Sequence, residues 1–314
     1  MPENERISVV IPCFNAARYI EGSILSVLAQ DWPDLDIVVV DDGSSDGSAE
    51  LIGSRFPGVN VLQQANQGVA AARNRGISAA RGDWIAFLDA DDIWLPGKLK
   101  AQVDLLRTNA GSRMCYTAWQ VWTSTDPVPT QEYLDTLQKL STDRERWAGP
   151  SGWMYHHLLQ DCVVWTSTVL AERSLLSDVG GFDPNLPIGE DYDLWLRVSR
   201  VTPILRVTEP YALYRMHAAS ITRSVPAENY AGLVISRALA KWGYSSPDGS
   251  TAEKSKVDRS LARSWTDLAG ACYRARDYTR ARQAALMGVR TCLWDLAGWK
   301  VLFKTAATAL GYGK

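Results

Sequence analysis

The chain reads WIAFLDADD from Trp84 to Asp92, and this stretch carries the strongest signal about fold and chemistry. Its apolar part predicts a short buried strand, and its polar part places three carboxylates within four residues. Carboxylates this close repel one another unless a cation lies between them, and such ligands suit Mg²⁺ or Mn²⁺. One interpretation is therefore a metal-bound nucleotide diphosphate. The other is an Asp-rich turn in which Asp92 caps a helix beginning near Trp94.

Strand and helix patterns alternate over the first 110 residues. Strands are expected at 7–11, 37–40, 59–63 and 84–88, and helices at 17–30, 49–56 and 69–80. Strands that are apolar on both faces and joined by helices imply an α/β fold, with a mostly parallel sheet and helices on both faces. Right-handed crossovers bring the loops after such strands to one edge, where ligands bind. We therefore expect Pro12–Asn15, Asp41–Asp46 and Asp89–Asp92 to converge.

The rest of the chain divides into a less regular part and a helical part. Residues 111–165 contain five tryptophans and one helix pattern at 132–140, which suggests an insertion on the acceptor side of the sheet. Regular patterns then predict strands at 166–170, 204–207 and 211–216 and a helix at 190–198. From residue 227 the pattern is helical, with a polar linker at 245–255.

Two segments of the helical part stand out. Residues 268–281 resemble one tetratricopeptide unit, and because such repeats need about three copies to be stable alone, we interpret this part as an appendage. Residues 293–310 place Leu296, Trp299, Leu302, Phe303, Ala306 and Leu310 on one helix face. Either a docking helix or an interfacial membrane helix has this pattern, and we favour docking.

Composition narrows the class of protein. The 314 residues carry a net charge of −2, are 46% hydrophobic and 22% charged, and so are typical of a soluble globular protein without a nucleic-acid partner. Five cysteines without a CxxC pair favour a reducing cytoplasm. The start of the chain has no signal-peptide pattern, and no apolar run reaches the roughly 18 residues of a transmembrane helix. We expect a cytoplasmic protein, and 293–310 leaves open a peripheral contact with the inner face of the membrane. Thirteen tryptophans suggest sugar-stacking platforms, although core packing is the default for most of them.

Several motifs in order identify a family by resemblance. They are Ile11–Asn15 (IPCFN), Val39–Gly47 (VVDDGSSDG), Asn66–Gly68 (NQG), Ala71–Gly76 (AARNRG), Phe87–Asp92 (FLDADD), Gly180–Asp183 (GGFD), Gly189–Arg197 (GEDYDLWLR) and Tyr214–His217 (YRMH). As an ordered set they resemble the inverting glycosyltransferases of family two, which have the GT-A fold. The resemblance covers about residues 6–224. It implies a catalytic domain at 1–224, including the acceptor-side insertion at 111–165, and a helical C-terminal extension at 225–314.

The resemblance implies a nucleotide-sugar donor at the first loops, most simply a UDP-sugar. Asp42 would hydrogen-bond the base, with Asp41 close by and Pro12 shaping the loop beneath it. A carboxylate can accept from the N3–H of uracil, whereas the simpler interpretation of this segment is a tight Asp-Gly turn. Arg73 would reach the diphosphate, unless it is a solvated residue on a helix face. The helix otherwise presents the small residues Ala70, Ala71, Ala72 and Gly76, which would let a ligand approach its backbone. The remaining candidates on the donor side are Asn15, Ala90 and Trp195, and Trp195 could equally pack in the core.

The family pattern also implies which residues bind the metal and which residue is the general base. Asp89 and Asp91 match its DxD motif, with Asp91 as a ligand of Mn²⁺ or Mg²⁺ and Asp89 nearer the ribose or the metal-bound water. His217 matches a histidine that approaches the metal in many relatives, or it is a structural surface residue. Asp191 matches the general base and Glu190 a supporting residue, although acidic residues at a helix N-terminus are favoured in any case.

These assignments predict a metal-dependent inverting glycosyltransferase. It would transfer a sugar to a hydroxyl of a glycan or lipid-linked acceptor, in the synthesis of a cell-surface or extracellular polysaccharide. The alternative is a non-catalytic nucleotide-sugar-binding or scaffold protein with the same fold. A dehydrogenase and a P-loop NTPase are excluded because the chain has neither glycine-rich fingerprint. The sugar, the acceptor, the linkage, the oligomeric state and the role of the C-terminal helices are left open.

Overall fold

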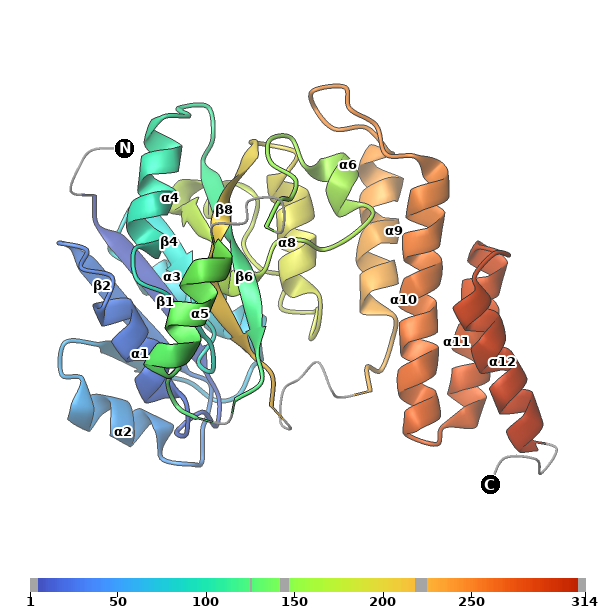
Figure 1. Ribbon diagram of the computed structural model, residues 1–314, viewed down its shortest axis with the longest axis horizontal. Coiled ribbons are helices and arrows are strands. Elements are labelled where there is room, and N and C mark those ends of the chain that lie inside the picture. The colour runs from blue at the N-terminus through green and yellow to red at the C-terminus, as the bar shows by residue number, and fades with distance from the viewer. Residues whose placement is uncertain (1–4, 125, 142–146, 218–224, 310–314) are drawn as a thin grey trace. The chain divides into compact units, whose positions relative to one another are not determined.

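The computed structural model describes residues 5–124, 126–141, 147–217 and 225–309, which belong to two compact units (Figure 1). The first unit comprises residues 1–154 and 163–217, and the second comprises 155–162 and 218–314. The domain boundary expected at residue 224 falls in 218–224, outside the described residues.

A central sheet of eight strands organises the first unit, in the order β3-β2-β1-β4-β7-β6-β8-β5. The strands are β1 (Ile7–Cys13), β2 (Leu35–Asp41), β3 (Asn60–Gln63), β4 (Trp84–Phe87), β5 (Ile93–Trp94), β6 (Met114–Trp122), β7 (Leu170–Glu172) and β8 (Ile204–Arg215). The four strands from β3 to β4 are parallel to one another, as expected for strands joined by helices. In the other half β7 is antiparallel to β4 and β6, β8 is parallel to β6, and β5 is antiparallel to β8.

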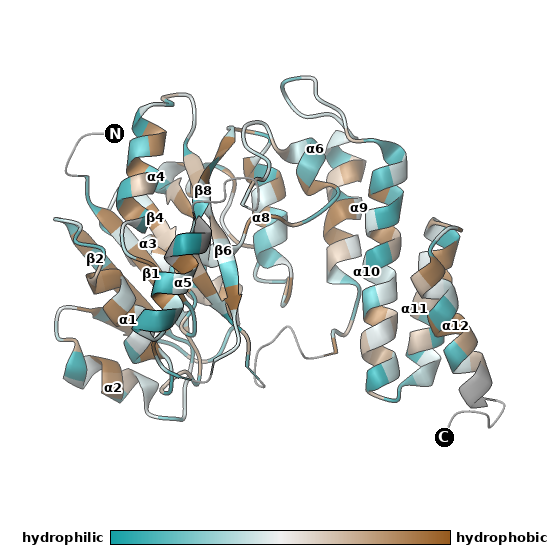
Figure 2. Ribbon diagram, in the orientation of Figure 1, coloured by the Kyte–Doolittle hydropathy of each residue, from teal (hydrophilic) through white to brown (hydrophobic). Residues whose placement is uncertain are grey.

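Helices cover both faces of this sheet, which confirms the α/β class. They are α1 (Ile20–Leu28), α2 (Ser48–Arg55), α3 (Val69–Ala79), α4 (Lys98–Arg107), α5 (Gln131–Ser141), α7 (Arg173–Asp178) and α8 (Glu190–Val198). On one face Val9 of β1 packs in a cluster with Ile24 of α1 and Val103 of α4. On the other face α3 lies so close to β1 that a Cβ at Gly76 would come within 2.4 Å of Val10 Cγ1. Apolar residues accordingly dominate the central strands (Figure 2).

The close approach of α3 corrects one detail of the sequence interpretation. We took the small residues of this helix to admit a ligand to its backbone. Instead, Ala72 packs against Val38 and Val40 of β2, and Gly76 faces β1. The small residues therefore serve helix–sheet packing. Arg73, on the same helix, is also buried.

Three other element predictions were wrong in part. The segment at 111–165 is not irregular throughout, because β6 runs for nine residues in the middle of the sheet. The strands expected at 204–207 and 211–216 form one strand, β8, whose pairing with β6 shifts register beside Pro210. At 166–170 the chain first makes a 3-10 turn, η1 (Thr166–Thr168), before β7.

The second unit is helical in its described residues. It contains α6 (Tyr155–Leu158), α9 (Tyr230–Trp242), α10 (Lys254–Arg274), α11 (Tyr278–Thr291) and α12 (Leu296–Ala309). The tetratricopeptide-like segment forms the end of α10, a turn at Arg276 with φ 64°, and the start of α11, where the Asp277 side chain accepts from the backbone N–H of Arg280. No described helix is both long enough and apolar enough to span a membrane.

Candidate active site

The loops after β1 and β2 are joined through Asn15. Its side-chain oxygen accepts from the backbone N–H of Ser45 at 2.9 Å, and its backbone N–H donates to Ser44 Oγ at 2.9 Å. Asn15 has a φ of 51°, a left-handed conformation that asparagine tolerates better than most residues. Two of the loops that we expected to converge are therefore in direct contact.

The adjacent carboxylates Asp41 and Asp42 are both buried, but only one of them is fully engaged within the protein. Asp42 accepts from the Gln64 side chain at 2.7 Å and from the backbone N–H groups of Gln67 and Gly68 at 2.9 and 2.8 Å. It thereby holds the loop that leads into α3. Oδ1 of Asp41 has no hydrogen-bond partner among the described residues. A buried acceptor without a donor is costly, so Asp41 offers the more available oxygen to a ligand N–H.

Arg73 connects the DxD motif to the start of α8. Its guanidinium donates to Asp89 Oδ1 at 2.7 Å and to Glu190 Oε1 at 2.6 Å, and its side chain is only 4% exposed. Burial alone would lower the pKa of Arg73, but Asp89, Glu190 and Asp191 outweigh it and raise that pKa. Arg73 is thus not a solvated residue on a helix face. One buried cation fixes two acidic segments that are about 100 residues apart in the chain.

Asp91 meets His217 at the end of β8. Its Oδ2 lies 2.9 Å from His217 Nε2, and the Asp91 side chain is 29% exposed. Burial and the charge of Asp89 raise the pKa of Asp91, while His217 lowers it. Arg215 braces the same loop, because its Nε donates to the backbone oxygen of Asp91 at 2.7 Å. The two predicted ligands Asp91 and His217 are therefore neighbours.

Asp92 proves to be structural, but not as the helix cap that we considered. Helix α4 begins only at Lys98, and Asp92 accepts instead from Ser167 Oγ at 2.6 Å, Trp165 Nε1 at 3.2 Å and the backbone N–H of Arg215 at 2.9 Å. Burial, followed by the charges of Asp91 and Asp89, raises the pKa of Asp92 well above its usual range. These contacts hold the DxD loop against η1 and β8.

The donor set around Asp91 fits a small divalent cation that also binds phosphate. An ion with ligands at about 2.1 Å in octahedral geometry separates adjacent ligand atoms by about 3 Å, close to the Asp91–His217 distance. A cation would also relieve the repulsion between Asp89 and Asp91. Among the described residues there is no cluster of three or more His, Cys, Asp or Glu side chains that could hold a metal. The chain would therefore supply few ligands, and water and the diphosphate would supply the rest, as is usual for Mg²⁺ at phosphate sites.

Asp191 is held at the N-terminus of α8 by contacts that sequence analysis missed. Its Oδ2 accepts from Thr166 Oγ1 at 2.8 Å and its Oδ1 from the backbone N–H of Tyr192 at 2.7 Å. Next to Thr166, the Ser167 hydroxyl accepts from the backbone N–H of Asp89 at 3.0 Å. Turn η1 therefore contacts both acidic motifs through consecutive hydroxyls, which a strand pattern at 166–170 did not indicate.

Glu190 lies at the same helix N-terminus, and the pKa of its carboxyl is raised. Burial and the charge of Asp191 raise the pKa of Glu190 to about 7, although Arg73 works in the opposite direction. Glu190 is 6% exposed, so its carboxyl contributes mainly by fixing Arg73.

Three other candidates do not offer side chains to a ligand in this arrangement. Trp195 is fully buried between Phe87 and Phe182, so core packing is its role and the donor-binding interpretation fails. Pro12 is buried within β1, where it pairs with Val40 of β2. Ala90 is 7% exposed, and its carbonyl accepts from Ser23 Oγ at 2.8 Å, which ties the DxD loop to α1.

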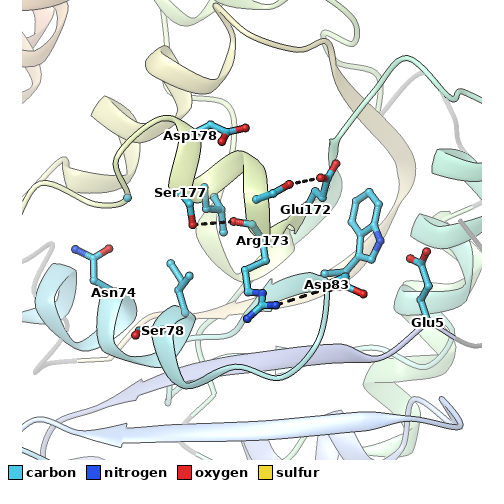
Figure 3. Close-up of a pocket in the computed structure, with 13 residues that line it drawn as sticks. Glu5, Asn74, Ser78, Asp83, Glu172, Arg173, Ser177 and Asp178 are labelled. Atoms are coloured by element: carbon cyan, nitrogen blue, oxygen red, sulfur yellow. Dashed lines mark hydrogen bonds and ion pairs between the residues drawn. The ribbon is translucent and has the colours of Figure 1, made fainter.

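A cavity of about 950 Å³ lies elsewhere on the first unit (Figure 3). Asn74 and Ser78 of α3, Arg173 and Ser177 of α7, and Asp83 border it. Asp83 immediately precedes β4, whereas Asp89 follows its other end. The cavity thus opens at the opposite ends of the parallel strands from the acidic motifs, and none of the predicted donor or metal residues lines it.

Comparison with known proteins identifies the family. The family model for glycosyl transferase family 2 matches residues 8–144. An uncharacterized glycosyltransferase of Nostoc sp. is 34% identical over 248 residues, which cover 73% of this chain and 72% of the relative. The chain belongs to glycosyl transferase family 2, and the protein is a glycosyltransferase.

Other relatives differ in length. A glycosyltransferase of Escherichia coli named UDP-Glc:alpha-D-GlcNAc-diphosphoundecaprenol beta-1,3-glucosyltransferase is 30% identical over 222 residues, covering 69% of this chain and 79% of the relative. This chain spans 66% of one Rickettsia prowazekii relative and 32% of a Rickettsia conorii relative.

Solved structures share the fold. A UDP complex of Staphylococcus aureus TarS residues 1–349 superposes with a TM-score of 0.60 at 16% identity, covering 98% of this chain and 92% of that one. A Pyrobaculum calidifontis mannosyltransferase in complex with GDP-Man and Mn²⁺ has a TM-score of 0.54 at 17% identity, covering 98% and 87%. At these identities the likeness establishes a GT-A-like fold.

Proposed function

We propose that the protein transfers a sugar, with inversion, from a UDP-sugar to a hydroxyl acceptor in a reaction that depends on Mn²⁺ or Mg²⁺. The observation that supports this most strongly is the double ion pair of Arg73. Because one guanidinium binds both Asp89 and Glu190, the DxD loop and the start of α8 are held within a few ångströms of a common point. A transferase needs this proximity, since the base must act on the acceptor as the donor's leaving group departs.

The donor would lie along the ends of β1, β2 and β4. The unpaired Oδ1 of Asp41 is suited to accept from the N3–H of uracil, and Asp42 keeps the surrounding loop closed on it. UDP and UDP-GlcNAc are bound by the TarS structures that share this fold, whereas GDP-Man is bound by the archaeal one. The E. coli relative is named for a UDP-linked donor, and with the TarS complexes this supports the assignment of UDP.

Asp91 and His217 would hold the divalent ion. Bound there, a divalent ion would supply Lewis-acid neutralisation of the diphosphate charge. Neighbouring residues orient the metal-binding side chains. Arg215 holds the backbone of Asp91, and Asp92 anchors the DxD loop to η1. Arg73 keeps Asp89 in an orientation toward the donor side of this loop.

Asp191 would act as the general base. Thr166 and the backbone of Tyr192 orient its carboxylate, which accepts the proton of the attacking hydroxyl. Asp191 lies in the first turn of α8, so the helix start fixes its place relative to the DxD loop. We assign the acceptor to a glycan or lipid-linked saccharide in polysaccharide synthesis, supported by the lipid-linked acceptor in the name of the E. coli relative.

Release of the nucleoside diphosphate from a panel of UDP- and GDP-sugars, with Mn²⁺ or with EDTA, tests this proposal. We expect UDP release that requires the metal and falls at least about a thousandfold in Asp191→Asn, because general-base catalysis and proper positioning are both lost. Anomeric inversion in the product would be read by proton NMR. Undiminished turnover in EDTA, or release from GDP-sugars only, would contradict the assignment. Binding without turnover for every donor would favour the alternative of a non-catalytic nucleotide-sugar-binding protein.

A further inference from the structure

Helix α12 has one apolar face that the second unit uses. Val301 and Leu302 pack on a cluster from α10 and α11 that includes Leu268, Cys272 and Ala285. Thr305 on the same side is 3% exposed. The helix therefore docks within its own unit through Val301 and Leu302. Of the expected apolar face, Leu296, Trp299 and Phe303 are exposed, and Leu310 lies outside the described residues.

A second apolar face of α12 is left in solvent. Leu296 is 79% exposed, Trp299 40% and Phe303 70%, at helix positions i, i+3 and i+7. The turn before the helix adds Leu293 at 70% and Trp294 at 87%. We call these five residues the C-terminal ridge. Trp299 links the ridge residues, because its Nε1 donates to the backbone oxygen of Leu293 at 3.0 Å and the centroid of its ring lies 6.3 Å from that of Phe303.

Two lysines share the helix of the ridge. Lys300 and Lys304 are both exposed, and Lys304 Nζ also lies 5.9 Å from the centroid of the Tyr273 ring. From Tyr278 to Lys314 the basic residues are Arg280, Arg282, Arg290, Lys300, Lys304 and Lys314. The sole acidic residue of that stretch is Asp295, and its carboxylate accepts from the Thr266 hydroxyl. The partner that this surface fits is therefore apolar in part and negatively charged.

We propose that the C-terminal ridge binds the surface of an anionic lipid bilayer. Tryptophan, phenylalanine and leucine beside lysine are the composition of helices that lie in the interface, with the apolar side chains immersed by about 5–10 Å. Lysine reaches the headgroups while its alkyl chain stays with the apolar side chains. A second copy of this chain fits less well, because a two-fold contact through the ridge would bring Lys300 and Lys304 of both copies together.

This inference rests on the proposed function only for its purpose, which is to bring the enzyme to a lipid-linked acceptor. Binding to lipid itself depends on the ridge and not on Asp91 or Asp191. The two proposals can therefore fail separately: vesicle binding without UDP release would count against the function alone, and UDP release without vesicle binding would count against the ridge alone.

Co-sedimentation of the full chain with vesicles of phosphatidylcholine, with and without about a third phosphatidylglycerol, tests the ridge. We expect binding to the anionic vesicles and a loss of at least about tenfold in the double variant Trp294→Ser/Phe303→Ser, whose sites are exposed and so should not alter folding. The matched control is Leu28→Ser, an exposed apolar residue of α1, which should bind as the wild type does. Lys300→Glu/Lys304→Glu should lose binding to anionic vesicles most strongly at low salt.

Two results would overturn the inference. One is equal partitioning of the wild type and the ridge variant, with both retaining the wild-type melting temperature. The other is a concentration-dependent dimer in analytical ultracentrifugation that Trp294→Ser/Phe303→Ser abolishes, since the ridge would then join two copies of the chain. UDP release measured without vesicles should be the same in the wild type and in all ridge variants.

Discussion

Replacing Arg73 with methionine should destabilise the first unit by about 3–5 kcal/mol, the usual cost of removing one partner from a buried ion pair. The guanidinium is 4% exposed and lies 2.6 Å from Glu190 and 2.7 Å from Asp89, so its loss leaves two carboxylates without a counter-charge. Methionine preserves much of the apolar volume, and the effect is therefore mainly electrostatic. The double variant Arg73→Met/Glu190→Gln removes one of the two orphaned charges and should recover about 1–2 kcal/mol.

Hydrogen exchange of peptides from β1 and β4 measures this change, because their amides report the opening of the sheet. The loss should be smaller at pH 5 than at pH 8. Arg73 opposes the rise in the pKa of Glu190, which already lies at about 7. Without Arg73 that pKa rises further, so the folded state binds more protons than the unfolded state and stability falls as the pH rises through that value. Arg75→Met, an exposed position on the same helix, is the control and should change stability by less than about 0.5 kcal/mol. A loss below about 1 kcal/mol in Arg73→Met, or no recovery in the double variant, would refute this account of the ion pair.

Three further changes have defined outcomes. Thr166→Val removes the hydroxyl that donates to Asp191, so it should lower kcat about tenfold or more and leave the UDP affinity unchanged. Thr166→Ser keeps the hydroxyl and should retain most of the activity. A fall in UDP affinity without a fall in kcat would contradict the positioning role of Thr166. Lys98→Met should raise the stability of the first unit by about 1–3 kcal/mol at pH 6 and by less at pH 10. Burial lowers the pKa of Lys98 from 10.5 to about 7, so the cost of its charge is full below about pH 7 and disappears as the pH rises from there toward 10.5. An equal gain at both pH values in thermal denaturation would show that the charge is irrelevant. Gly76→Ala should lower the free energy of unfolding, measured by urea titration, by about 1–3 kcal/mol, because its Cβ would lie 2.4 Å from Val10 Cγ1. The control Gly53→Ala has open space around its Cβ and should be neutral or stabilising.

The parallel half of the fold could be predicted from the sequence because each of its strands is an uninterrupted apolar run. Strands β1, β2 and β4 are buried along nearly their whole length, and such runs leave one interpretation once helical patterns separate them. Strand β6 was missed because its Trp119–Trp122 end mixes partly exposed residues with aromatic ones, which does not give a clean alternation. Pro210 lies between the two strands expected at 204–207 and 211–216, where the structure has a register shift that accommodates the missing N–H.

The acidic motifs could be found in the sequence, but the partners of those motifs could not. Asp89, Asp91 and Asp191 each belong to a local pattern, whereas Thr166 and Arg215 reach them across 25 and 124 residues. The residues next to Thr166 in the sequence do not indicate that its hydroxyl will contact a carboxylate on another element. The alternative of a helix cap at Asp92 was open for the same reason, because capping is a local possibility, whereas its donors in the structure include Ser167 of η1 and the backbone N–H of Arg215 in β8.

The central claim is that Asp91 binds a metal-held nucleotide diphosphate while Asp191, on a neighbouring element, takes part only in the chemistry. Calorimetric titration of UDP in the presence of Mn²⁺ into the wild type, Asp91→Asn and Asp191→Asn tests it directly. We predict that Asp191→Asn binds UDP with the affinity of the wild type and that Asp91→Asn loses the part of the affinity that depends on Mn²⁺. Metal-independent UDP binding in Asp91→Asn as tight as that of the wild type with Mn²⁺ would contradict the account.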